Sequence, residues 1–293
     1  MVGNSWLGYQ PFYVQNVLHP ELVSPQLNVT MLVSDVSVIR MLTNQAAAVA
    51  FLSLDNALSL NSRTDLNFCV ASVLTSSYGA DAVLARPEFA RKFKHELKQK
   101  TATDAPIVVG MEDSALSRFV LSRWLQLHGI DETRVQRQIV TPAGQLQAFE
   151  SKQFDAVISY APFSKRLEQA GAVTIFTSRE IPDEVIDTVI VRQSAWQAHS
   201  KLLSKYVTEN WDKALAAISN TTSKDFVTFA QLAELTPADL QLALNDIQTY
   251  DSTASKHFLQ SRYTQVAATV ANHLIESGLH DAVRPLPVCE GIL

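Results

Sequence analysis

Up to about residue 190, hydrophobic residues form short runs that alternate with segments of helical spacing. Residues 46–52 and 68–74 are almost continuously apolar, as in strands that are covered on both faces. Residues 27–33 alternate between apolar and polar, which is typical of a half-buried strand. The alternation of strands and helices predicts parallel sheets with crossover helices. Further strands are expected at residues 82–86, 106–110, 135–140, 155–159, 172–177 and 187–192.

Helical patterns lie between these runs and dominate the chain after residue 194. The clearest helix covers residues 114–128, with Asp113 or Ser114 suited to cap its start and Gly129 suited to end it. Its apolar face consists of Leu116, Phe119, Val120, Trp124 and Leu127. Other helices are expected at residues 11–18, 35–43 and 54–60, after Thr141-Pro142, and at 195–218, 223–232, 237–249 and 255–277.

The length of 293 residues is large for one core and predicts two α/β lobes. The order of elements assigns residues 1–84 to lobe one, 85–188 to lobe two, and 189–293 to lobe one again, with C-terminal helices that pack on it. The strands at 82–86 and 187–192 follow polar, turn-prone loops, so we expect the chain to cross between the lobes there and these strands to act as a hinge. A ligand would bind in the cleft between the lobes.

Composition narrows the class of protein. The chain is 47% hydrophobic and 18% charged, as in an ordinary globular protein, and no apolar run reaches the roughly 18–20 residues of a membrane span. The net charge of −5 argues against a nucleic-acid partner. Cys69 and Cys289 are too few for a disulfide framework, and their pairing stays open. The first residues show no signal-peptide pattern, so the protein is cytoplasmic or its signal peptide has been removed.

The search for catalytic and metal-binding motifs is negative. The sequence contains no G-x-G-x-x-G, phosphate-binding loop or G-x-S-x-G motif, and its seven histidines show no ligand spacing. We therefore expect no metal site, no cofactor and no enzymatic activity. Motifs do not address catalytic residues that converge only in space.

Strand-to-helix junctions supply the candidate binding residues, because ligands of open α/β sheets bind at the carboxyl ends of strands. Several candidates have structural alternatives: Trp6 and Phe163 as core residues, Asp55 and Ser114 as helix caps, Asp81 as a hinge residue. Carboxylates outnumber basic residues at these junctions, which suits an amine or a zwitterion, and the aromatic residues suit a cation or a flat ring. The candidates are Trp6, Tyr9, Asp55, Tyr78, Gly79, Asp81, Glu112, Ser114, Tyr160, Phe163 and Glu180.

The ordered set of junctions resembles the periplasmic solute-binding proteins of nitrate/sulfonate/taurine-type ABC transporters, a family that includes thiamin-pyrimidine binders. The resemblance rests on Trp6-x-Gly-Tyr9, Gly79-Ala-Asp81, Gly110-Met-Glu112-x-Ser114, Phe154-Asp-Ala-Val-Ile-Ser-Tyr160-Ala-Pro-Phe163, Phe176-Thr-Ser-Arg-Glu-Ile-Pro182 and Asp187-x-x-Ile-Val-Arg192. It implies the type II periplasmic-binding-protein fold, a cleft that closes on its ligand, and export to the periplasm.

The sequence thus predicts the solute-binding component of an ABC importer, acting as a monomer with a membrane permease as partner. Its ligand would be a small organic molecule that is sulfonate- or taurine-like, amine-bearing or pyrimidine-like. Two alternatives share the fold: the ligand-sensing input domain of a signalling protein, and a pyrimidine-modifying enzyme. The cysteine-rich segment of the yeast pyrimidine synthases is not found in this chain.

Overall fold

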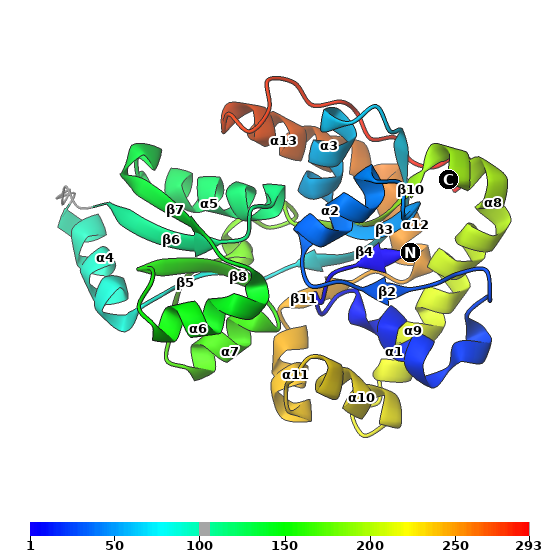
Figure 1. Cartoon of the computed structure of the whole chain (residues 1–293), viewed down its shortest axis with the longest axis horizontal. Coiled ribbons are helices and arrows are strands. Elements are labelled where there is room, and N and C mark those ends of the chain that lie inside the picture. The colour runs from blue at the N-terminus through cyan, green and yellow to red at the C-terminus, as the bar shows by residue number, and fades with distance from the viewer. Residues whose placement is uncertain (100–105, 293) are drawn as a thin grey trace.

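The computed structural model describes residues 1–99 and 106–292 and contains two β-sheets, each flanked by helices (Figure 1). We call the part built on the first sheet lobe one and the part built on the second sheet lobe two. The first sheet has the order β11 (Ile247–Thr249), β4 (Phe68–Ser77), β10 (Ile186–Arg192), β3 (Val49–Ser53), β1 (Val2–Gly3) and β2 (Thr30–Met31). The second has the order β7 (Val135–Ile139), β6 (Ile107–Met111), β8 (Ala156–Tyr160), β5 (Asp81–Ala85) and β9 (Val173–Thr177).

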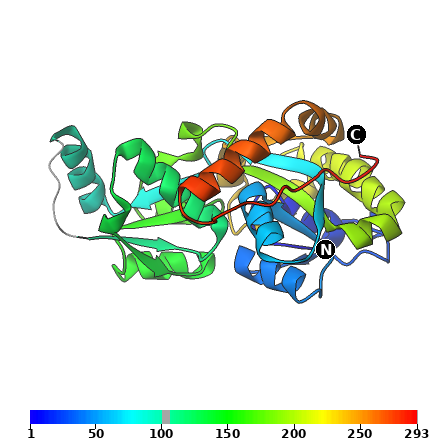
Figure 2. The same cartoon turned by 90° about the horizontal axis from the view of Figure 1, so that it is seen from above.

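The helices are divided unequally between the lobes, as the two views in Figures 1 and 2 show. Lobe two carries α4 (Pro87–Gln99), α5 (Ala115–His128), α6 (Gln145–Glu150) and α7 (Phe163–Gln169). Lobe one carries α1 (Gln10–Leu18), α2 (Asp35–Thr43), α3 (Leu54–Arg63), α8 (Gln193–Lys205), α9 (Trp211–Ile218), α10 (Lys224–Leu232), α11 (Pro237–Leu244), α12 (Ser252–Ser261) and α13 (Tyr263–Glu276). The C-terminal helices therefore pack back on lobe one, as expected.

The predicted α/β class and two-lobe architecture are confirmed, but the sheets are mixed rather than parallel. In lobe one, β10 runs antiparallel to both β3 and β4. In lobe two, β5 runs antiparallel to both β8 and β9. The chain enters each of these strands directly from the other lobe. The strand therefore runs antiparallel to its neighbours, because no crossover helix returns the chain to the opposite edge of the sheet.

Several predicted elements have different boundaries. The expected strand 27–33 shrinks to Thr30–Met31, an exposed edge strand. The expected helix 237–249 ends at Leu244, because residues 247–249 instead pair with β4 and bury Ile247. The expected helix 195–218 is interrupted by a π-helical segment over Tyr206–Asn210. The expected helix 255–277 is split into α12 and α13 at Arg262, whose φ of −126° is not helical.

Two short segments connect the sheets, residues 78–80 and residues 178–185. They are joined by Ser178 Oγ, which lies 2.7 Å from Ser77 Oγ and accepts the Gly79 amide at 2.7 Å. Gly79 has φ +125°, a conformation that favours glycine, and a Cβ there would lie 2.7 Å from Arg179 Nε. The predicted lobe boundaries after residues 84 and 188 fall within β5 and β10, and they stay predictions.

Cys69 in β4 and Cys289 in the C-terminal segment form a disulfide across 220 residues of sequence. The pairing that the sequence left open is therefore present in the fold. Among the described residues, no helix is both long and apolar enough to span a membrane.

The core extends from one lobe into the other. In lobe one, Phe12 stacks on Phe51 and Tyr206, with ring centroids 4.9 and 4.8 Å away. Between the lobes, the ring of Phe119 on α5 meets the edge of His273 on α13 at 5.0 Å. Apolar contact between α3 and α5 continues the same cluster. The lobes therefore touch over packed surfaces in this conformation.

Candidate functional site

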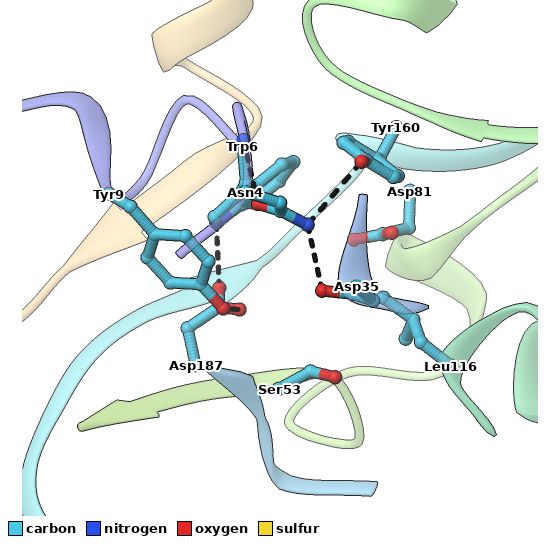
Figure 3. A pocket seen from close by; sticks show the side chains of 9 residues that line it. All are labelled: Asn4, Trp6, Tyr9, Asp35, Ser53, Asp81, Leu116, Tyr160 and Asp187. Carbon is cyan, nitrogen blue, oxygen red and sulfur yellow. Dashed lines mark hydrogen bonds between the residues drawn. The ribbon is translucent and has the colours of Figure 1, made fainter. Parts of the chain in front are cut away.

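A small pocket lies where the two lobes meet (Figure 3). Its free volume is about 230 Å³, including the part open to solvent. The enclosed part is only about large enough for a water molecule, so a larger ligand needs the lobes to move apart. Lobe one contributes Asn4, Trp6, Tyr9, Asp35, Ser53 and Asp187, and lobe two contributes Asp81, Leu116 and Tyr160.

The strand order brings these side chains to one place. Parallel strands β1 and β3 end side by side, and Asn4 and Ser53 lie at those ends. Asp187 lies at the start of antiparallel β10, and its register partner is Ser53. Lobe two repeats this geometry, because Asp81 at the start of antiparallel β5 is the partner of Tyr160 at the end of β8. β5 and β10 therefore each present a carboxylate at the carboxyl ends of their neighbours.

Asp187 fixes the aromatic wall of the pocket. Its carboxylate accepts hydrogen bonds from Trp6 Nε1 at 2.9 Å, from the Tyr9 hydroxyl at 2.7 Å and from Thr75 Oγ1 at 2.5 Å. The Trp6 ring in turn meets Tyr160 of lobe two edge to face, with ring centroids 5.9 Å apart. Trp6 is thus both a wall of the pocket and a buried residue with 4% exposure.

A second network joins Asn4 and Asp35 to lobe two. Asn4 Nδ2 donates to Asp35 Oδ1 at 2.8 Å and to the Tyr160 hydroxyl at 3.3 Å. Asp35 Oδ2 accepts from Asn56 Nδ2 at 3.0 Å. Glu112 Oε1, at the end of β6, accepts the amide of Val36 at 3.0 Å, and so bonds the start of α2 to lobe two. These bonds hold the two lobes in register around the pocket.

Burial shifts the acid–base behaviour of the carboxyl groups in and beside the pocket. Burial raises the pKa of Asp187 to about 6, against the opposing effect of its hydrogen-bond donors. It raises the pKa of Asp55 to about 7 and that of Asp81 to about 8. Burial, followed by the neighbouring Glu112, raises the pKa of Asp35. Burial also raises the pKa of Glu112. A carboxylate loses hydration on burial, so the neutral acid is favoured unless a cation compensates.

Four of the predicted site residues line the pocket together: Trp6, Tyr9, Asp81 and Tyr160. Four others are buried close to it without lining it: Asp55, Glu112, Ser114 and Phe163. Ser114 caps α5 by accepting the Ser117 amide at 3.2 Å. Phe163 packs edge to face on Tyr160 at 5.5 Å and supports the wall from behind. Ser114 thus caps a helix and Phe163 packs on another aromatic ring, as the structural alternatives for these two residues state.

The other three predicted residues do not line the pocket. Tyr78 is 48% exposed and stacks under Arg179, with the guanidinium carbon 4.6 Å from the ring centre. Gly79 lies in the first connecting segment. Glu180 is exposed and closes a capping box with Thr177. All three belong to the connections between the lobes.

Sequence reasoning missed Asn4, Asp35, Leu116 and Asp187, and it counted Ser53 only as part of a junction. Asp187 carried a usable signal, because an acidic residue opens an otherwise apolar strand. Asp35 also carried one, since it begins a helix directly after the N-cap Ser34. Asn4 follows a strand of two residues and gave no periodic signal.

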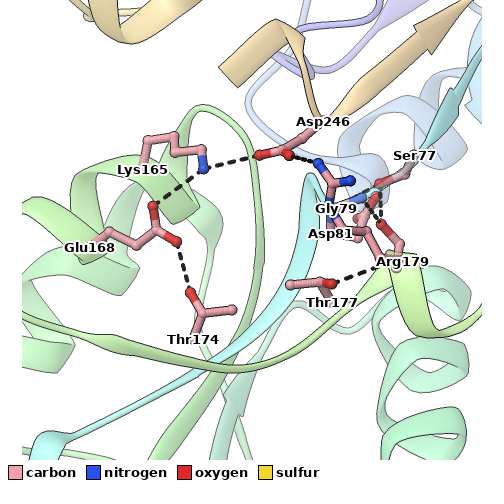
Figure 4. Close-up of polar contacts among 10 residues, drawn as sticks. Ser77, Gly79, Asp81, Lys165, Glu168, Thr174, Thr177, Arg179 and Asp246 are labelled. Atoms are coloured by element: carbon pink, nitrogen blue, oxygen red, sulfur yellow. Dashed lines mark hydrogen bonds and ion pairs between the residues drawn. The ribbon is translucent and has the colours of Figure 1, made fainter. Parts of the chain in front are cut away.

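Three ion pairs lie outside the pocket, at what we call the rim: Lys165–Asp246, Arg179–Asp246 and Arg166–Glu234. Figure 4 shows the two pairs of Asp246. Lys165 on α7 lies 3.1 Å from Asp246 of lobe one, and Arg179 of the second connecting segment bonds the other carboxylate oxygen. Each rim carboxylate therefore has a basic partner. Within the described ranges, no group of three His, Cys, Asp or Glu side chains is arranged to hold a metal ion.

Two lobes joined by two connecting segments, with a pocket between them, define the type II periplasmic-binding-protein fold. The sequence profile of the NMT1-like family matches residues 61–230, more than half of the chain, and the chain belongs to this family. The family resemblance expected from the sequence is confirmed. A comparison with curated proteins finds no match.

Solved structures share the fold at low sequence identity. The alkanesulfonate-binding protein SsuA from Xanthomonas axonopodis pv. citri, bound to MOPS, matches with a TM-score of 0.72 and 12% identity over 95% of this chain and 92% of that chain. The ligand-binding component of an ABC-type import system from Staphylococcus aureus, with zinc bound, matches with 0.77 and 10% over 99% and 96%. The periplasmic nitrate-binding protein NrtA from Synechocystis PCC 6803 matches with 0.65 and 10% over 98% and 91%.

Proposed function

We propose that the protein is the extracytoplasmic solute-binding component of an ABC importer. It captures a small organic ligand between the lobes, of the sulfonate- or taurine-like, amine-bearing or pyrimidine-like kind. The observation that carries this proposal is the pocket itself, because its buried polar and aromatic lining comes from both lobes. Such a lining is complete only when the lobes are together.

Closure of the lobes is the mechanism of capture. Only residues 78–80 and 178–185 connect the sheets, so a change of backbone angles in these segments moves one lobe relative to the other. A ligand that touches both Trp6 and Tyr160 favours the closed form by its difference in affinity for the two forms. The closed form presents a surface that a membrane permease recognises.

The disulfide supports a location outside the cytoplasm. Cys69–Cys289 is the kind of bond that persists in oxidising compartments such as the periplasm. The names of the similar structures, which include periplasmic and ABC-import proteins, point the same way. We propose that the protein acts there as a monomer and without a cofactor.

A thermal-shift screen tests the proposed function. A ligand that binds only the folded protein raises the melting temperature in a dose-dependent way. Small-angle scattering of the same sample should show a smaller radius of gyration with the ligand than without it. A panel of sulfonates, amines, amino acids and pyrimidines that gives no shift, from a sample shown by mass spectrometry to carry no small molecule, would contradict the proposal.

A further inference from the structure

The described ionisable side chains in and beside the pocket include several carboxyl groups and no basic group. Five carboxyl side chains lie in or beside it, each with at most 4% exposure, and no basic side chain lines it. Within residues 1–99 and 106–292, none of the five forms an ion pair with Lys, Arg or His. Buried carboxylates are normally paired with a cation or a metal. The five are Asp35, Asp55, Asp81, Glu112 and Asp187.

The five carboxylates differ in how far the protein satisfies them. Asp187 accepts three hydrogen bonds and Asp35 accepts two, so these groups already hold the aromatic wall and Asn4. Both oxygens of Asp55 and one oxygen of Glu112 are buried without a hydrogen bond of good geometry, although donors such as the Ser53 hydroxyl lie near Asp55 and oppose the rise of its pKa. The protein therefore leaves acceptor capacity unused around the pocket.

Asp81 lines the pocket together with Asp35 and Asp187, and it is the carboxylate that lobe two contributes (Figure 3). The Ser77 hydroxyl lies near its carboxylate, accepts the Asp81 amide at 2.9 Å and lies 2.7 Å from Ser178 Oγ. An ionised carboxylate has about four acceptor positions, so Asp81 keeps room for donors from a ligand. Asp35 of lobe one also lines the pocket, so the two lobes each contribute an acceptor to it (Figure 3).

The rest of the lining suits the same kind of ligand. Trp6, Tyr9 and Tyr160 bring aromatic rings to the pocket, and aromatic faces attract cations. The hydroxyls of Tyr9 and Tyr160 are held by Asp187 and Asn4, which keeps these rings in place. An anion in this position would face buried negative charge without a basic partner.

We propose that the pocket binds a small organic cation, an amine or an amidine, whose N–H groups are accepted by Asp81 and Asp35 and whose carbon atoms pack on Trp6. This inference rests on the proposed solute-binding function and selects the amine-bearing class within it. The enclosed space is small in this conformation, so the lobes must part to admit the cation.

The proposal predicts a pH dependence of binding. Asp81 is faced by Asp35 of α2, Asp55 of α3 and Asp187 of β10, and Glu112, which follows β6, faces Asp35. The rim cations Lys165 and Arg179 are bound to Asp246. With its pKa raised to about 8, Asp81 must lose a proton to pair with a cation. The affinity for a cation should therefore weaken by about tenfold for each pH unit below about 8.

Matched probes of opposite charge test the proposal. Propylamine, putrescine and agmatine should raise the melting temperature of the wild-type protein, and propanesulfonate and propionamide should not. Asp81→Asn should weaken amine binding roughly tenfold or more, because it removes the charge but keeps the shape. Asp65→Asn is the control, since Asp65 is an exposed aspartate of lobe one outside the pocket. Circular dichroism checks that both variants fold.

The outcomes separate this inference from the proposed function. Stabilisation by an amine that Asp81→Asn abolishes and Asp65→Asn preserves, with the pH slope in the wild-type protein, supports the inference. Stabilisation by propanesulfonate or propionamide and by no amine overturns it but leaves the solute-binding function intact. Amine binding that does not change with pH overturns the role of Asp81. A sample that responds to no compound and carries none overturns both.

Discussion

The pocket and the rim both lie between the lobes, but the carboxylates in them have different partners. At the rim, Asp246 is paired with Lys165 and Arg179, and Glu234 is paired with Arg166. In the pocket, carboxylates face one another, and their partners are an indole, hydroxyls and amides. The chain thus places basic residues in the gap but keeps them out of the pocket. This difference is the basis for proposing that a cationic ligand balances the pocket carboxylates once they ionise.

The largest expected effect is a loss of stability as the pH rises. The folded pKa values of about 6 for Asp187, 7 for Asp55 and 8 for Asp81 exceed the unfolded value, so the folded protein binds more protons than the unfolded chain between about pH 4 and pH 8. The free energy of unfolding of the ligand-free protein should fall by several kcal/mol over that range, because each group contributes about 1.4 kcal/mol for every pH unit between its unfolded and folded pKa. Urea denaturation at a series of pH values measures this, and a free energy that rises toward pH 8 would refute it.

A smaller effect is expected when Asp187 is removed from the pocket. Asp187→Ala leaves the donors of Trp6, Tyr9 and Thr75 buried without their acceptor, and should lower the free energy of unfolding by about 3 kcal/mol. The measurement is chemical denaturation near neutral pH. A loss below about 1 kcal/mol would mean that this network does not hold the aromatic wall.

Trp6→Phe should have an intermediate effect, because it keeps an aromatic ring and removes one hydrogen bond to Asp187. We expect a loss of about 1–2 kcal/mol in the free energy of unfolding. In a double-mutant cycle with Asp187→Ala, the cost of Trp6→Phe should shrink, because the bond is already absent. Strictly additive costs would show that Trp6 and Asp187 act independently.

The smallest effect is expected at the rim. Asp246→Asn removes the acceptor of two partly exposed cations and should change the free energy of unfolding by no more than about 1 kcal/mol. High salt should reduce the difference further, since it screens exposed pairs more than buried ones. If Asp246→Asn cost as much as Asp187→Ala, the contrast between rim and pocket would fail.

About half of the residues that line the pocket were predicted from the sequence. The direction of the strands explains which residues were found and which were missed. Trp6, Tyr9 and Tyr160 follow predicted strands, and Asp81 ends a polar loop. A search of the strand-to-helix junctions therefore identifies all four. Asp187 was missed because it lies inside a strand that only pairing reveals to be antiparallel. Contacts among Asn4, Asp35 and Tyr160 depend on how the lobes meet, which no local pattern encodes.

The fold was predicted better than the site, because hydrophobic periodicity reports burial directly. Nine of the described strands lie at or near predicted positions, whereas β11 lay within an expected helix. There the backbone pairing of Ile247 with Ser77 overrides the helical pattern. The Cys69–Cys289 disulfide could not be predicted from local sequence patterns, since 220 residues separate the two cysteines.

The most direct test of the central claim counts protons during binding. Isothermal titration of the tightest-binding amine at about pH 7, in two buffers with different heats of ionisation, measures proton exchange. We expect release of about one proton per ligand, because Asp81, with a pKa of about 8 in the free protein, ionises to meet the cation. Binding without proton release, or with proton uptake, would contradict it.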